Sequence, residues 1–297
     1  MNRNSKTARR INKIVFYVSL VFMLFIILFP FIIMLSTSLK GAKEAIQYPP
    51  TIIPKNITFE HYRDIFNPKI FPFLNYFKNS LYVAVFTAII SVAAGIFGGY
   101  SLSKLNFMGK TVINDSFYTV YMFSGILLVV PLFRIMSKLG LHDTKTALII
   151  TLVVQTLPTS IYMLKSYFDT IPKDLEEAGM IDGLNRIQVI FKIIIPLSLA
   201  GIASVFIYCF MIAWNDYLFA VVFISSPEYF TLPIGLNALF NTPDYIWGRM
   251  MAASLVTALP VVIMYAVSEK FIRGNMLPRG LNRHHPLPPS IPTPHPT

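Results

Sequence analysis

Long apolar blocks alternate with short polar segments along the chain as far as about residue 274. A helix needs about 20 mainly apolar residues to cross the hydrocarbon core of a bilayer. Six blocks reach or approach this length, and they cover residues 14–39, 79–103, 116–133, 146–164, 196–224 and 250–271. The pattern therefore predicts an all-α, polytopic membrane protein with six transmembrane helices, which together form one membrane domain over residues 1–274.

The composition agrees with a protein that is dissolved in lipid. Hydrophobic residues make up 55% of the 297 residues, charged residues make up only 13%, and the mean hydropathy is +0.60. A net charge of +11 could indicate nucleic acid as a partner, but the basic residues form short clusters between the apolar blocks. Such clusters are typical of membrane flanks, so we expect membrane lipid and no nucleic acid as a partner.

The basic residues also predict an orientation. Six spans place both termini on one side, and the basic cluster before residue 14 indicates that this side is the cytoplasm. The first block is longer than the apolar part of a signal peptide, so we expect it to remain as an anchor. A short loop that is predicted to be external runs against this trend, because it contains Arg134, Lys138 and Lys145. These basic residues are compatible with an anionic sugar as the substrate.

Two segments outside the blocks differ in composition from the rest. Residues 40–78 are rich in Pro, Asn and aromatic residues, and they form either an external ledge that contacts a partner or a connector with local packing. Residues 275–297 are rich in Pro and His, which predicts a disordered tail. The single cysteine, Cys209, lies inside an apolar block and is expected to be buried.

The interior loop over residues 165–196 predicts a helix, a turn and a second helix. We expect the first helix over 172–180, because Pro172 suits a first helical turn and carboxylates follow it directly. Gly183 tolerates the positive φ that stops a helix, so it should form the turn. The second helix has apolar residues at i, i+3, i+4 and i+7, namely Ile187, Ile190, Phe191 and Ile194. We expect this unit at the inner membrane face, with small residues and carboxylates presented to a docking protein.

The same loop resembles the EAA loop of the permease subunits of bacterial binding-protein-dependent ABC importers. Residues 171–183 read Ile-Pro-Lys-Asp-Leu-Glu-Glu-Ala-Gly-Met-Ile-Asp-Gly, and Phe191 and Ile195-Pro196 follow them. The resemblance extends from the first block to about residue 274 and is strongest with the MalG-like carbohydrate permeases. Further matching pieces are Pro49-Pro50 with Ile53-Pro54, Asn79-Ser80-Leu81, Trp214-Asn215-Asp216 and Thr231-Leu232-Pro233.

Two features depart from the family pattern. Gly179 stands in place of the second alanine of the EAA triplet, and we expect it to loosen the first helix of the loop slightly. The Pro/His-rich tail is unlike the short ending of the family, so no terminal contact is carried over.

The resemblance implies the fold of a type I ABC importer permease, placed in the bacterial cytoplasmic (inner) membrane with both termini in the cytoplasm. The partners it implies are a second homologous permease subunit, two ATPase subunits, an external solute-binding protein and an oligosaccharide substrate. By resemblance, the ATPase-coupling residues are Glu176, Glu177, Ala178, Gly179, Asp182 and Gly183.

The chain itself is expected to be neither an enzyme nor a holder of a cofactor or metal. Gly109-Lys110-Thr111 imitates the end of a phosphate-binding loop, but it lacks the earlier glycine and a preceding strand. ATP and Mg are therefore expected on the partner ATPase subunits.

Asp216 is the most informative residue for a substrate path, because a carboxylate inside an apolar span is costly unless it faces a cavity or a partner. The candidate path residues, whose rings and polar groups suit a sugar, are Trp214, Asn215, Asp216, Tyr217, Gln155, Tyr121 and Tyr162. The same side chains could instead form hydrogen bonds that hold the helices together. The alternative function is an ion-coupled secondary transporter in which Asp216 carries the ion, although the sequence shows no repeated halves.

Overall fold

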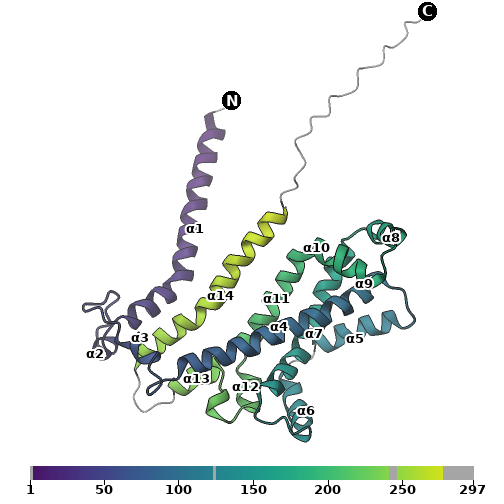
Figure 1. Ribbon diagram of the computed structural model, residues 1–297. Helices are drawn as coiled ribbons and strands as arrows, with labels where there is room; N and C mark the ends of the chain where they lie inside the picture. The colour runs from purple at the N-terminus through teal and green to yellow at the C-terminus, as the bar shows by residue number, and fades with distance from the viewer. Residues whose placement is uncertain (1–2, 123–124, 241–245, 277–297) are drawn as a thin grey trace, which may run out of the picture.

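The computed structural model describes residues 3–122, 125–240 and 246–276, and it describes no side chains at 3–11, 118, 120–122 and 269–276. Within these residues the protein is all-α, and the β-structure is a single isolated bridge between Lys40 and Ile57. Figure 1 shows a group of crossing helices beside a pair of long helices that diverge from it. The all-α prediction is confirmed.

Four of the six predicted spans correspond to single long helices. These are α1 (Arg3–Ser38), α4 (Phe73–Lys104), α7 (Lys145–Asp169) and α14 (Trp247–Met276). The stretches of them that are long and apolar enough to cross a membrane are Asn12–Ser38, Phe73–Lys104, Lys145–Asp169 and Trp247–Ser268. Proline lies inside α1, α7 and α14, where a long apolar helix tolerates it because neighbouring groups satisfy the freed carbonyl.

The fifth predicted span is wrong as one helix over 196–224. Within it lie the end of α10 (Ile195–Leu197), α11 (Leu199–Trp214) and α12 (Leu218–Phe223), and directly before it lie α9 (Arg186–Val189) and a π-helical turn (Ile190–Ile194). The helix over Arg186–Leu197 meets α11 at a bend of 84°. At the other end, short polar side chains bond to nearby backbone groups and compete with the helix: the Asn215 amide donates to the Met211 carbonyl at 2.9 Å.

The third predicted span, over 116–133, falls on two shorter helices, α5 (Lys110–Met122) and α6 (Gly125–Lys138). Residues 123–124 between them lie outside the described residues. The described residues thus contain four helices of membrane length, or up to five when the bent pair is one span, and six are not confirmed. Most of the predicted tail, residues 277–297, also lies outside the described residues, and α14 continues through Met276.

The core lies where α4, α7 and α11 pack together. Gly95 and Gly99 of α4 face α7, and a Cβ at Gly99 would lie 3.0 Å from the Lys165 backbone nitrogen. Small residues of this kind let two helix backbones approach closely in lipid. Two buried polar contacts join the same three helices: Ser91 to Thr156 at 2.7 Å and Ser160 to Cys209 at 3.0 Å. The prediction that Cys209 is buried is confirmed.

The segment between α1 and α4 folds back on the start of α14. It contains α2 (Ala42–Ala45) and α3 (Glu60–Ile65). Asp64 forms a 2.7 Å ion pair with Arg249 of α14, and buried His61 contacts the Lys40 carbonyl at 2.8 Å. These contacts support the reading of residues 40–78 as a locally packed connector, while a role of its exposed aromatic residues in contacting a partner remains a prediction.

The positions of the helix ends bear on the orientation. In Figure 1, α8 (Lys173–Ile181), the start of α1 and the end of α14 point toward one end of the molecule. The opposite end carries α2, α3, α6 and α13 (Leu232–Phe240). The side of the membrane that each of these ends faces stays a prediction.

Candidate functional site

The predicted helix–turn–helix at residues 165–196 is present in the structure. Pro172 is the N-cap of α8 instead of lying in its first turn, and Gly183 after the helix has φ 87°. Asn185 and Gln188 then form a capping box that starts α9. The helix predicted over 172–180 differs from α8 by one residue at each end.

The apolar face predicted for the second helix is wrong as a single face. Ile190 and Ile194 are buried at 4% and 0% exposure, whereas Ile187 and Phe191 are 63% and 56% exposed. The reason is the π-helical turn over Ile190–Ile194, because a wider turn changes the angular spacing on which the i, i+3, i+4 and i+7 pattern depends. Exposed apolar residues therefore lie beside α8 at this end of the molecule.

The six expected coupling residues divide into two groups. Glu177, Ala178, Asp182 and Gly183 are exposed, as expected. Glu176 is instead buried, with 7% exposure, and accepts a hydrogen bond from the Tyr100 hydroxyl of α4. Helix geometry explains the difference between the two adjacent glutamates, since neighbouring positions point about 100° apart.

Gly179 is also buried, and its expected loosening of the helix stays a prediction. A Cβ at Gly179 would lie 2.5 Å from Cδ1 of Ile193, so even an alanine there would displace the Ile193 side chain. The missing side chain lets α8 pack against the π-helical turn. The space beside Gly179 is thus occupied by the end of the Ile193 side chain, which the sequence pattern did not reveal.

A cavity of about 470 Å³ opens at the break between α11 and α12. Its lining comes from two of the core helices and the break, and consists of Gln155, Met211, Ile212, Asn215, Asp216, Tyr217 and Leu218. The structure thus brings together four of the seven predicted path residues, including Gln155 from a distant part of the sequence. Polar groups and an aromatic ring around an otherwise apolar hollow can bind a solute that has both hydroxyl groups and apolar ring faces.

Asp216 has defined partners inside the chain. Its carboxylate accepts hydrogen bonds from the backbone N–H groups of Ala220 at 2.9 Å and Phe219 at 3.4 Å. These donors belong to the first turn of α12, which has no partners for them within the helix. One role of this carboxylate is therefore to start α12; the bonds lie within residues 216–220 and so differ from the bonds between helices given as the alternative.

The other predicted path residues do not line this cavity. Trp214 is 1% exposed, stacks on Phe210 at 5.5 Å between ring centroids and meets Phe77 edge-on, so it belongs to the core. Tyr162 lines a second cavity of about 460 Å³, together with Asn114, Lys165 and Tyr208. The side chain of Tyr121 lies outside the described residues.

The loops that are predicted to be external contain contacts that sequence reasoning missed. Lys145, predicted as an external cation, donates to Asn79 Oδ1 at 3.2 Å and lies over the rings of Tyr82 and Tyr229. Lys145 is thus engaged within the chain, whereas Arg134 and Lys138 are exposed.

A second missed contact joins the loop before α7 to the loop after α12. The backbone N–H groups of Ser225 and Ser226 donate to Asp143, as does the Ser226 hydroxyl. Hydrogen bonds from Ser226, first of all the one from its hydroxyl, lower the pKa of Asp143. The sequence signal was the unusual polar run at residues 142–144, next to the start of α7.

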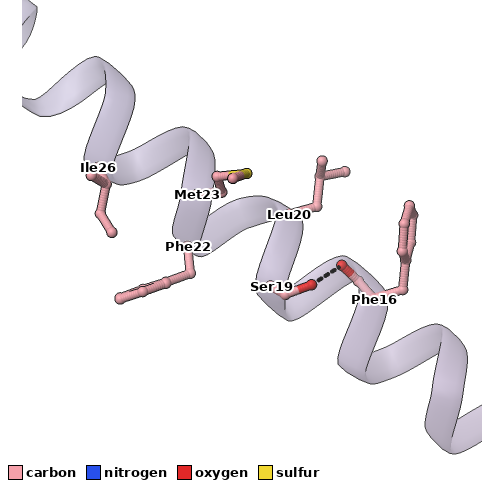
Figure 2. A pocket seen from close by; sticks show the side chains of 6 residues that line it. All are labelled: Phe16, Ser19, Leu20, Phe22, Met23 and Ile26. Atoms are coloured by element: carbon pink, nitrogen blue, oxygen red, sulfur yellow. Dashed lines mark hydrogen bonds between the residues drawn. The ribbon is translucent and has the colours of Figure 1, made fainter.

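A shallow hollow on α1 is not a solute site. Figure 2 shows that its lining side chains come from this one helix and project outward from it. The single polar group, the Ser19 hydroxyl, donates to the Phe16 carbonyl at 2.9 Å. An apolar surface whose only hydroxyl is satisfied by its own backbone suits lipid or another apolar helix.

Comparisons with known proteins agree with this geometry. The family described as "Binding-protein-dependent transport system inner membrane component" matches residues 91–274. "Inner membrane ABC transporter permease protein YcjP" of Escherichia coli (strain K12) is 64% identical over 281 residues, which are 95% of this chain and 99% of that protein. "Trehalose/maltose transport system permease protein MalG" of Thermococcus litoralis is 34% identical, over 88% of this chain and 94% of that protein.

A solved structure is similar over most of the chain. It is a "bacterial ABC transporter involved in the import of the acidic polysaccharide alginate", with a TM-score of 0.79 and 26% identity. The alignment covers 89% of this chain and 97% of that chain.

Proposed function

Because this chain belongs to the family of binding-protein-dependent transport system inner membrane components, we propose that it is the permease subunit of an ATP-driven importer for an oligosaccharide. The observation that carries this proposal is α8, which exposes Glu177, Ala178 and Asp182 at one end of the molecule. A short helix with small and acidic residues is a surface that a separate protein can dock against. Relatives named for trehalose and maltose support a sugar as the substrate.

In this proposal the chain forms part of the sugar path and changes its conformation during transport. The partner ATPase subunits bind ATP and Mg. Glu177 offers a charge-assisted hydrogen bond to a basic residue of the ATPase, which is stronger than a bond between neutral groups. Ala178 and Gly183 have little or no side chain, so the backbone of the ATPase can approach the backbone of this chain closely. A second homologous permease subunit completes the membrane part, and an external solute-binding protein delivers the sugar. Residues 1–274 form the membrane domain in the inner membrane, with both termini in the cytoplasm.

The cavity at the break between α11 and α12 is proposed as part of the sugar path. Gln155 and Asn215 carry amides that can both donate to and accept from sugar hydroxyls, and Tyr217 offers a ring for the apolar face of a pyranose. The cavity with Tyr162 and Tyr208 lies on the same two helices, α7 and α11, and is proposed as a further stage of this path. Trp214 has no direct role in this path, because it is buried in the core.

The test is uptake by vesicles that contain the complete complex purified with its solute-binding protein, offered trehalose, maltose and alginate-derived oligosaccharides. Uptake of at least one sugar is expected to require ATP and Mg and to persist when ion gradients are collapsed. In the same assay, Gln155→Ala is expected to raise the half-saturating sugar concentration about 10-fold, because one buried hydrogen bond is lost.

Met211→Leu is the matched control, since it changes the same cavity without changing a polar group, and it should leave uptake close to that of the unmodified protein. Uptake that an ion gradient drives without ATP would contradict the proposal. If both substitutions changed the half-saturating sugar concentration equally, Gln155 would have no specific role in the sugar path.

A further inference from the structure

Tyr100 and Glu176 form a buried contact between α4 and α8. Tyr100 lies in the last turns of α4 with 2% exposure, and Glu176 lies in the first turn of α8 with 7% exposure. The phenol hydroxyl donates to Glu176 Oε1 across a sequence separation of 76 residues. A buried carboxylate is costly unless it is hydrogen-bonded, so this bond holds α8 in one place against α4.

Further contacts join the end of α4 to the segment that leads into α8. The Lys104 ammonium donates to the Ile171 carbonyl at 2.6 Å, and the Ser103 hydroxyl donates to Asp169 Oδ1 at 2.6 Å. Lys104 also interacts electrostatically with Glu176, and Arg186 with Tyr100. Residues from the end of α7 to the first turn of α8 are thus attached to one turn of α4.

The connection from α8 toward α11 is of a different kind. It passes through the π-helical turn and then through the 84° bend before α11. The Ser198 hydroxyl at this bend is buried and has no hydrogen-bond partner within the described residues. Sharp bends and π-helical turns are places where helix geometry adjusts. α4 and α7, in contrast, pack closely through Gly95 and Gly99.

We propose that the Tyr100–Glu176 contact is a positioning contact that makes α8 move as one body with α4, while the bend before α11 absorbs the change in angle. This inference rests on the proposed function, and it assigns to Glu176 a role different from that of Glu177. Glu177 binds the ATPase subunit, and Glu176 attaches α8 to the transmembrane helices that the ATPase moves. Tyr100 and Glu176 are positioning residues, because they touch neither the sugar nor the nucleotide.

The test measures distances between spin labels in the full complex, embedded in lipid discs, without nucleotide and with ATP, Mg and vanadate. One label is placed at Ile181→Cys on α8 and the other at Ala94→Cys, exposed on α4; a second pair joins Ile181→Cys to Val221→Cys on α12. The native Cys209 is fully buried. The α8–α4 distance is expected to stay the same in both states, while the α8–α12 distance changes.

Tyr100→Phe is expected to add a second α8–α4 distance, which comes from molecules in which α8 has detached from α4. The fraction of these molecules should rise about 10-fold, because a hydrogen bond to a charged group is lost. Glu176→Leu should behave in the same way. Glu176→Gln should restore the single distance, because its amide oxygen still accepts the phenol hydrogen. Ser101→Ala is the control. The Ser101 hydroxyl, one residue along α4 from Tyr100, donates to the Phe97 carbonyl of its own helix.

The possible outcomes separate this proposal from the proposed function. A complex that shows no ATPase activity and no nucleotide-dependent change in either distance overturns the proposed function. A nucleotide-dependent change in the α8–α4 distance of the unmodified protein overturns the positioning contact alone. So does an unchanged single distance in Tyr100→Phe, or a detached population in Glu176→Gln equal to that in Glu176→Leu.

Discussion

Glu177→Lys is expected to abolish ATP-driven uptake, with a loss of at least about 100-fold, while the protein still inserts in the membrane and assembles with its partner permease. The side chain is exposed, so the folded chain tolerates the change. At the docking surface the substitution replaces an attraction to a basic residue with a repulsion, and like charges placed together at an interface cost several kcal/mol. Uptake and ATPase activity of the reconstituted complex measure the effect.

Asp174→Lys is the matched control for this substitution. It makes the same change of charge on the same helix, also at an exposed position, but outside the six residues expected to couple to the ATPase. It weakens α8 only through the helix dipole, by about 0.3–1 kcal/mol, so most of the uptake should remain. Normal uptake in Glu177→Lys, or equal losses in both variants, would remove Glu177 from the coupling surface.

Asp216→Ala is expected to destabilise the region around α12 and to lower uptake strongly. The substitution leaves the N–H groups of Phe219 and Ala220 without their acceptor, and loss of such a helix-start acceptor costs about 0.5–2 kcal/mol. Asp216→Asn should keep most of the stability and the uptake, because its amide oxygen can still accept from the same donors. Thermal unfolding of the purified complex and vesicle uptake measure both variants.

The same pair of variants distinguishes the two transport mechanisms. An ion carrier needs the negative charge, so an ion-coupled transporter would lose activity in Asp216→Asn as fully as in Asp216→Ala. A folded Asp216→Asn protein without any uptake would favour the ion-coupled alternative. Retained ATP-driven uptake would confine Asp216 to its structural and path roles.

Local patterns in the sequence predicted the features that local physics determines. Uninterrupted apolar length identified α1, α4, α7 and α14, because a bilayer requires that length whatever the neighbours are. The stop at Gly183 followed from its backbone freedom, and its φ of 87° agrees. The same reasoning failed at 196–224, where hydropathy continued across Asn215 and Asp216. The signal there was two short polar side chains that bond to the nearby backbone, which neither the path interpretation nor bonds between helices predicts.

Features that depend on distant residues could not be predicted from local patterns. Helix geometry predicts that the two adjacent glutamates of α8 point in different directions, but only the position of α4 with Tyr100 shows which of them is buried. Gly179 looked like a weakened alanine until Ile193 was seen to occupy the space of its side chain. Trp214 looked like a sugar platform, yet Phe77 and Phe210 enclose it in the core.

In the proposed function, α8 is the surface by which a separate ATPase moves this chain from the cytoplasmic side. Ile181, at the end of α8, is 86% exposed, and the only native cysteine is buried, so Ile181→Cys gives a single reactive thiol. With a membrane-impermeant thiol reagent, labelling is expected in inverted membrane vesicles stripped of the ATPase, and it should be blocked when the ATPase is added back. Labelling in right-side-out vesicles, or labelling that the ATPase leaves unchanged, would contradict the claim.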